Sequence, residues 1–320
     1  MWIPSPLPRT FAACERDARS SKADVRASAV TDLVRHARSS ETRAPAMALI
    51  ASALKDESAR VRARAAIAIA DAYDAETHGE LPQETIDAIL GAADDEDDEV
   101  RQMAITALGE IGDERALPRL SRASHDERPS MRYQAVIAIA RMASAGDETR
   151  IKALLRASSD DDFNIRYIAM RLAEEHFANK PHERLRLRAV ALLDDDERDV
   201  AIAAAIFLGH AGDERGKPML RRIVRGEIPV QREDEREAVE LVGSLDMKDL
   251  IPDLEKRAFG LARHVRDTCS FHAMIALARL GHPRAVATIR KDMASRSDKR
   301  REAATIAAER AALEPQRTSS

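Results

Sequence analysis

Cysteines, aromatic residues and long apolar runs are all scarce in this chain of 320 residues. The two cysteines, Cys14 and Cys269, are too few for a disulfide framework and are typical of a reducing compartment. No run approaches the roughly 18 apolar residues of a transmembrane helix, so none is expected. Residues 1–10 form a proline-rich leader that lacks the apolar core of a signal peptide. We therefore expect a cytoplasmic protein that does not enter the membrane.

The chain also lacks a large net charge, because it has 51 basic and 55 acidic residues. No overall field would therefore steer the chain to a polyanion. The charge is nevertheless uneven: residues 57–97 hold three basic and eleven acidic residues, whereas residues 263–320 hold twelve basic and six acidic ones. Alanine, leucine, isoleucine and arginine are abundant, and this composition favours helices over strands.

A repeat of 31 to 39 residues runs along the chain, and the segment from Arg101 onward serves as its template. Nine anchor positions equivalent to Arg101 can be aligned, and each is followed three residues later by an alanine. Apolar residues just before the anchor and four and seven positions after it draw a stripe along one helix face. An alanine in this stripe lets neighbouring helices approach closely. The nine alanines are Ala29, Ala65, Ala104, Ala135, Ala169, Ala204, Ala238, Ala273 and Ala304.

Turn signals divide each repeat into two helices. The tetrad Gly-Asp-Glu-Arg occurs at residues 112–115 and 212–215. Its glycine suits the left-handed position that ends one helix, and its aspartate can cap the next. Pro118, Pro218 and Pro252 fall within the first helix of their repeats and should kink it.

Two helices per repeat predict an all-α fold, a right-handed α-solenoid of about nine helical hairpins. We expect one solenoid over residues 11–312 and a disordered tail at residues 313–320. The pattern resembles HEAT repeats, in the short bacterial form that is also seen in phycobilin-lyase-like repeats. This resemblance determines the architecture and leaves the function open, because the same stack serves many partners.

The resemblance also implies a ladder of polar contacts. In HEAT repeats an aspartate in the turn between the helices and an arginine six residues later form hydrogen bonds between successive repeats. The fifth repeat keeps Asp195 but has Ala201, and later repeats have Glu235 and Ser270 in place of the arginine. We therefore expect a regular N-terminal half and a looser C-terminal half. The matching pairs are Asp56 with Arg62, Asp95 with Arg101, Asp126 with Arg132, and Asp160 with Arg166.

Three classes of enzyme are built from HEAT-like repeats, and the residues of this chain give little support to any of their activities. Deoxyhypusine hydroxylase binds iron through recurring His-Glu dyads, whereas His182-Glu183 is a single dyad and His78 with Glu80 is not at an equivalent position. The HEAT-like DNA glycosylases need aromatic residues in a basic cleft, and the bilin lyases need a tetrapyrrole pocket that nothing here marks. No phosphate loop, nucleophile elbow or CxxC pair is present. We therefore expect no enzyme activity, cofactor, metal site or small-molecule substrate.

A partner surface is expected on the concave side, which the second helix of each repeat lines. Positions one, five and nine after the anchor share the helix face turned away from the core. In the middle repeats they carry aromatic residues with arginines beside them, the composition of binding hot spots. Large residues there could instead simply cover the joints between repeats, and both interpretations stay open. The predicted partner-binding residues are Tyr133, Ile137, Arg141, Tyr167, Arg171, Ile202, His210 and Phe271.

The favoured function is a non-catalytic scaffold that binds a protein or peptide along the concave face. The alternative is nucleic-acid binding by the basic C-terminal repeats. Against it, no aromatic residues are interleaved with these charges as in single-strand binders. Terminal repeats also need a polar outer face to remain soluble. The basic residues are Arg284, Arg290, Lys291, Arg296, Lys299, Arg300 and Arg301.

Overall fold

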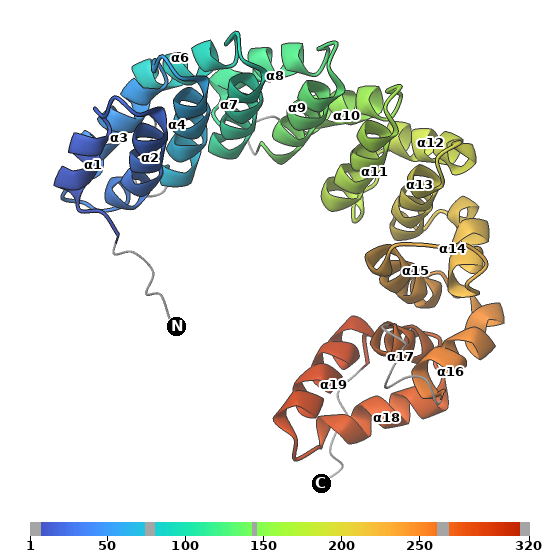
Figure 1. Ribbon diagram of the computed structural model, residues 1–320. Helices are drawn as coiled ribbons and strands as arrows, with labels where there is room; N and C mark the ends of the chain where they lie inside the picture. Colours follow the sequence, from blue (N-terminus) through green and yellow to red (C-terminus); the bar gives the residue numbers. More distant parts are fainter. Residues whose placement is uncertain (1–7, 74–80, 143–145, 261–268, 314–320) are drawn as a thin grey trace. The chain divides into compact units, whose positions relative to one another are not determined.

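The computed structural model describes residues 8–73, 81–142, 146–260 and 269–313. Within these ranges it contains 18 α-helices and no strand, so the predicted all-α fold is confirmed (Figure 1). The helices belong to two compact units, unit 1 up to Ile168 and unit 2 from Ala169. The boundary falls inside α11 (Phe163–Phe177), so this helix contributes residues to both units.

Unit 1 has two layers of helices, one made by the first helix of each repeat (the A helix) and one by the second (the B helix). In the B layer, α4 packs against α2 and α7, and α7 packs against α9. The A helices are α1 (Phe11–Asp17), α3 (Arg43–Ala53), α6 (Gln83–Ala92), α8 (Leu117–Ala123) and α10 (Gly146–Ala157). The B helices are α2 (Ala23–Ala37), α4 (Ala59–Ala72), α7 (Asp98–Ile111), α9 (Pro129–Arg141) and the start of α11.

Unit 2 repeats this arrangement with its own B layer, in which α15 packs against α13 and α17, and α17 against α19. Together, the described helices of the two units make the nine A–B pairs that the sequence predicts. The A helices of unit 2 are α12 (Glu183–Ala191), α14 (Lys217–Val224), α16 (Ile251–Phe259) and α18 (Pro283–Met293). The B helices are the end of α11, α13 (Arg198–His210), α15 (Arg232–Ser244), α17 (Ser270–Arg279) and α19 (Asp298–Arg310).

The repeat anchors explain how the B helices pack. All nine anchor residues lie in the first turn of a B helix. The alanine three residues later is fully buried in eight repeats, and Ala304 is 6% exposed. Small residues are needed there because the helices are close: a Cβ built on Gly109 of α7 would lie 2.5 Å from the Cβ of Ala138 in α9. The predicted stripe of small and apolar residues is therefore the interface between B helices.

The predicted glycine and aspartate signals end and begin helices as expected. Gly112 follows α7 with a φ of 71°, and Gly212 follows α13 with a φ of 68°. Asp113 and Asp213 each cap a 3₁₀ turn, and their side chains accept a hydrogen bond from the backbone N–H two residues later. The polypeptide thus reverses direction at each tetrad with its terminal backbone groups satisfied.

The predicted proline kinks are wrong. Pro118, Pro218 and Pro252 occupy the first turn of α8, α14 and α16, and a 3₁₀ turn precedes each helix. The N–H groups of a first turn have no partner within the helix, so proline removes no hydrogen bond there. These α-helices therefore begin one residue before the proline, and none has a proline in its interior.

Unit 1 contains the arginine–aspartate ladder, and Arg62 shows its geometry. The Nε and Nη2 of Arg62 donate to the carboxylate of Asp95 in the next repeat, at 2.7 and 2.8 Å. Its Nη1 donates to the backbone carbonyl of Asp56, six residues earlier, at 2.9 Å. The pair six residues apart therefore meets through the carbonyl of the aspartate, whose carboxylate binds Arg26 of the preceding repeat. The same carboxylate contact links Arg132 to Asp160, and the same carbonyl contact links Arg132 to Asp126 and Arg166 to Asp160.

Arg101 departs from this pattern. It donates to the backbone carbonyl of Asp95 and forms an ion pair with Asp98. The carboxylate of Asp126, the expected acceptor in the next repeat, instead accepts hydrogen bonds from Nε and Nη2 of Arg128 at 2.8 and 2.9 Å. The Nε of Arg101 is buried without a hydrogen-bond partner among the described residues. Competition from Arg128 thus interrupts the ladder at this junction.

Among the described residues, the first helix begins at Phe11 and the last ends at Arg310. Residues 1–7 of the expected leader and residues 314–320 of the expected tail lie outside the described residues. None of the described helices is long and apolar enough to cross a lipid bilayer.

Candidate functional site

The B helices of unit 2 line a cavity of about 390 Å³, which we call the B-face pocket. Its walls come from α11, α13, α15, α17 and α19, and α15 supplies six of the residues. Leu241 is the only lining residue with an apolar side chain, so polar and charged groups are available to a ligand around most of the cavity. The lining residues are Arg171, His210, Glu233, Arg236, Glu237, Glu240, Leu241, Ser244, His272, Arg279 and Arg310.

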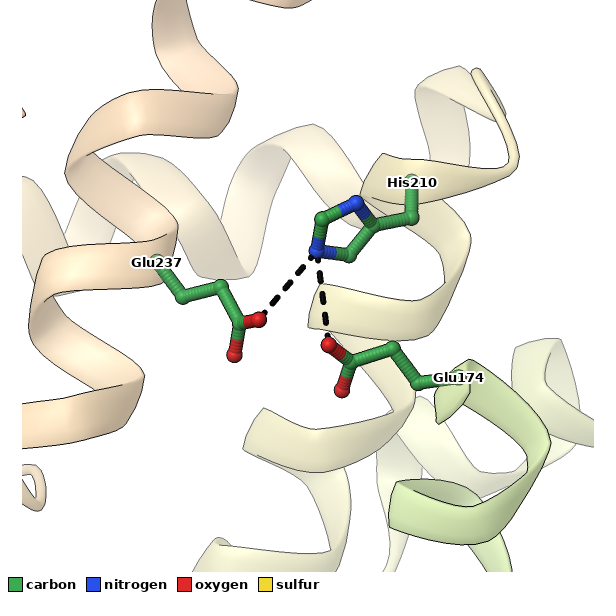
Figure 2. A group of neighbouring side chains, drawn as sticks. All are labelled: Glu174, His210 and Glu237. Carbon is green, nitrogen blue, oxygen red and sulfur yellow. Dashed lines mark hydrogen bonds and ion pairs between the residues drawn. The ribbon is translucent and has the colours of Figure 1, made fainter. Parts of the chain in front are cut away.

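Three side chains that can ligate a metal or exchange a proton converge beside this pocket. Glu174 of α11, His210 of α13 and Glu237 of α15 point toward one another (Figure 2). The Nε2 of His210 lies 3.4 Å from Oε1 of Glu174 and 3.4 Å from Oε1 of Glu237. The ligating atoms of all three residues lie within 4.8 Å of one another. We call these residues the Glu-His-Glu cluster.

Arg171 lies behind the cluster, one turn before Glu174 on α11. Its Nη1 is 2.8 Å from Oε2 of Glu174, 3.0 Å from Oε2 of Glu237 and 3.4 Å from Oδ1 of Asp234. Asp234 is only 2% exposed. One guanidinium therefore faces three carboxylates, and full ionisation would leave two negative charges uncompensated in a largely buried place.

The protonation of these carboxylates follows from this imbalance. Burial, together with a hydrogen bond to Glu237 and its charge, raises the pKa of Glu174 to about 8. Burial would also raise the pKa of Glu237, but hydrogen bonds from His210, Glu174 and Arg171 outweigh it and lower that pKa to about 2. Burial raises the pKa of Asp234 as well, against the attraction of Arg171. At neutral pH the cluster thus retains a proton between Glu174 and Glu237.

A second polar network lies in the same pocket and has the opposite balance of charge. Glu240, which is 8% exposed, pairs with His272 Nδ1 at 3.1 Å and accepts a hydrogen bond from Nε of Arg310 at 3.0 Å. The Nη2 of Arg279 lies 3.4 Å from its carboxylate. Burial favours the neutral acid, yet His272 and the two arginines lower the pKa of Glu240. Cations therefore outnumber the anion here, and the pocket has an acidic part and a basic part.

Local sequence places both networks on neighbouring helices. Glu237 and Glu240 are three residues apart on α15 and therefore share a helix face. Gly209 brings the end of α13 against α15, because a Cβ at this position would lie 2.8 Å from Cδ1 of Leu241. His210, the next residue, is thereby held beside Glu237.

The predicted partner residues of unit 2 have three different positions. Arg171 and His210 both line the B-face pocket. Phe271 is half-buried and lines another cavity of about 500 Å³, with Met274 and Lys291. Ile202 is 1% exposed, so its prediction as a surface contact is wrong. The reason is that α13 is buried from Val200 to Gly209, and Ile202 packs in the core with residues of α15.

The predicted partner residues of unit 1 lie on its last B helices. Tyr133 is half-buried and lines a cavity of about 240 Å³ with Asp162 and Asn164. Ile137 and Tyr167 are also half-buried, and Arg141 is exposed. Their role in binding stays a prediction.

Sequence reasoning missed most of the polar networks. Glu174 lies eight positions after its anchor and Glu237 two positions after its own, each next to a position that was expected to face a partner. Glu240 lies five positions after its anchor, where a partner-facing residue was expected, but neither it nor His272 was among the predicted site residues. The available signal was the number of charged residues along the B helices of unit 2. Which of them meet depends on the rotation of each helix in the stack, and spacing alone does not give that rotation.

Stacked A and B helices whose turns are linked by a ladder define an α-solenoid of two-helix repeats. The sequence profile of the family described as HEAT repeats matches residues 46–140 and, in an overlapping match, residues 86–173. Residues 46–173 are therefore similar to HEAT repeats, as the repeat pattern indicated. No curated protein matches the sequence.

Solved structures show the same architecture. YibA of E. coli is 17% identical, with a TM-score of 0.61 over 85% of this chain and 93% of its own. Kap95p is 12% identical, with a TM-score of 0.54 over 94% of this chain and 46% of its own. At such identities the likeness establishes the fold alone.

Proposed function

We propose that this protein is a non-catalytic scaffold that binds a protein or peptide partner, and that the B-face pocket of unit 2 is its main contact. The polar lining of the pocket supports this proposal. Ion pairs hold Arg171 against Glu237 and Arg310 against Glu240, so a partner would immobilise few additional rotamers of these side chains on binding. A likeness in fold points the same way, because the HEAT-like Kap95p binds RanGDP.

The basic part of the pocket favours an acidic group on the partner. The Nε of Arg236 is buried and has no hydrogen-bond partner among the described residues. Arg310, whose side chain is 45% exposed, and Arg279 both contact Glu240, which neutralises only one of them. A carboxylate of the partner would pair with the guanidinium of Arg236, which lines the pocket, and complete this charge balance.

Affinity capture with charge-reversed variants tests the proposal. Arg236→Glu should reduce capture of the partner at least tenfold, since it replaces the attracting cation with an anion. Arg290→Glu is the matched control, because Arg290 is exposed on α18 and does not line the B-face pocket. Circular dichroism should show both variants folded. Equal capture by wild type and Arg236→Glu would place the binding surface elsewhere.

Nucleic-acid binding by the basic C-terminal repeats is the second candidate. Two of the seven basic residues predicted for this function already have partners within the chain. Arg284 stacks on Phe259 at 4.1 Å, and Arg301 pairs with Asp298. Nuclease treatment before capture separates the two candidates. A partner that survives this treatment and depends on Arg236 supports protein binding.

A further inference from the structure

We propose that Glu174, His210 and Glu237 form a binding site for a transition-metal dication of the zinc class, which would link α11, α13 and α15 within unit 2. This inference is separate from the scaffold function, because the cluster would bind the ion with or without a protein partner. It rests on the positions of the donor atoms, on the buried charge around them and on the role of Arg171.

The donor atoms have the spacing of a metal site. Zn²⁺ binds nitrogen and oxygen at about 2.0–2.2 Å in tetrahedral geometry, which separates neighbouring ligand atoms by about 3.4 Å. The Nε2 of His210 lies 3.4 Å from each of the two facing carboxylate oxygens. The side chain of His210 is 32% exposed, so an ion can enter from solvent and keep water as a fourth ligand.

The charge around the cluster also fits a dication. Glu174, Glu237 and Asp234 carry three negative charges when ionised, and Arg171 supplies one positive charge. A divalent ion would offset the two charges that remain. The side chains of Glu174 and Asp234 are only 11% and 4% exposed, so water can offset little of this charge.

Arg171 orients the carboxylates of Glu174 and Glu237 for binding a metal ion. It donates a hydrogen bond to Oε2 of Glu237 and forms an ion pair with Oε2 of Glu174. The Oε1 atoms of both glutamates face His210 (Figure 2). Ligating carboxylates in metal sites are commonly held in this way by a neighbouring hydrogen-bond donor. Arg171 is therefore a positioning residue that does not itself ligate.

The ligand set selects among cations. One imidazole and two carboxylates suit Zn²⁺ and similar transition metals, whereas Mg²⁺ and Ca²⁺ prefer oxygen ligands alone. The rival explanation is that the cluster only shares a proton and holds no ion. The Glu240 network provides an internal reference, because it also pairs a histidine with a glutamate but has one carboxylate and two arginines.

Titration of the full chain with Zn²⁺, after removal of any polyhistidine tag, tests the proposal by calorimetry and thermal melting. We expect one Zn²⁺ per chain, a melting temperature that rises with Zn²⁺ concentration, and binding at least tenfold tighter than that of Mg²⁺. His210→Ala and Glu174→Gln should each weaken Zn²⁺ binding at least tenfold. Glu174→Gln imitates the protonated acid and so should keep the fold intact.

The matched controls are His272→Ala and Glu240→Gln in the neighbouring network, which should leave the affinity for Zn²⁺ unchanged. No saturable binding of Zn²⁺ up to millimolar concentration would overturn the proposal and leave the shared proton as the explanation. Binding that persists in both His210→Ala and Glu174→Gln would also overturn it, because the ion would then lie elsewhere. Either failure leaves the scaffold function untouched, since that is tested through Arg236.

Discussion

In unit 1 three ladder arginines, Arg26, Arg62 and Arg132, each pair with a largely buried aspartate of the next repeat, whereas in unit 2 three carboxylates surround one arginine. The consequences are opposite. In the ladder, the hydrogen bond from Arg62 lowers the pKa of Asp95, while in unit 2 burial raises the pKa of Glu174. A matched pair stabilises the folded chain and has little left to offer a ligand. An unmatched cluster costs stability and is therefore the better candidate for binding.

The largest expected effect comes from breaking a matched pair. Arg132→Ala removes both hydrogen bonds to Asp160 and leaves a carboxylate that is only 9% exposed without its cation. We expect the free energy of unfolding to fall by about 1–3 kcal/mol. Arg101→Ala should cost less, because Arg101 makes no contact with the carboxylate of the next turn. Chemical denaturation of the two variants measures the difference.

Arg60→Ala is the control for these variants. Arg60 pairs with Asp24, but both side chains are more than two-thirds exposed, so the pair should contribute under about 1 kcal/mol. If Arg132→Ala and Arg60→Ala have equal effects, burial does not distinguish the ladder from an ordinary surface ion pair.

The ladder shows how far the sequence alone determines the fold. The anchor, the alanine three residues later and the turn aspartate are local features, so they predicted the B helices and most ladder residues. The prolines misled because a proline is tolerated in a first turn, and the sequence does not show where that turn begins. Arg101 departs because Arg128 competes for the same carboxylate, and only the three-dimensional contacts reveal that competition.

The candidate site was less predictable, for a physical reason. The residues of the B-face pocket come from five helices, and small changes in helix rotation decide which side chains meet. Arg171 and His210 were predicted to face a partner, and both line the pocket. Ile202 occupies the same kind of position but is buried, because α13 is apolar on all sides. Position within a repeat therefore restricts the choice of site residues without determining it.

A smaller effect on partner binding is expected from truncating the aromatic residues of unit 1. These variants test whether unit 1 also has a binding surface. Tyr133→Ala and Tyr167→Ala should each weaken partner binding by more than about 1 kcal/mol if they are hot spots. If they only cover joints between repeats, the melting temperature should fall while affinity stays unchanged. Measuring stability and affinity on the same variants distinguishes the two outcomes, and Ile137→Ala on the same helix as Tyr133 serves as a comparison.

A further expected effect is a difference in how the two units respond to pH, for which no side chain is removed. The pKa of Asp95 is lower in the folded chain than its unfolded value of about 3.9. Its contribution to stability is therefore present above about pH 4 and is lost only as the pH falls through the folded pKa. The ladder of unit 1 should consequently be insensitive to pH between 5 and 9.

Glu174 has the opposite effect on how stability changes with pH, because its folded pKa of about 8 lies above the unfolded value of about 4.3. The folded state holds a proton that the unfolded state has released, so stability falls as the pH rises toward 8. Amide hydrogen exchange, measured with a metal chelator present and corrected for the intrinsic exchange rate at each pH, should show that α11, α13 and α15 open more readily at pH 8.5 than at pH 5.5. Glu174→Gln should abolish this difference, because it cannot ionise. A slope of the same size in Glu174→Gln would show that another group titrates, and an equal slope in α4 and α7 would remove the contrast between the units.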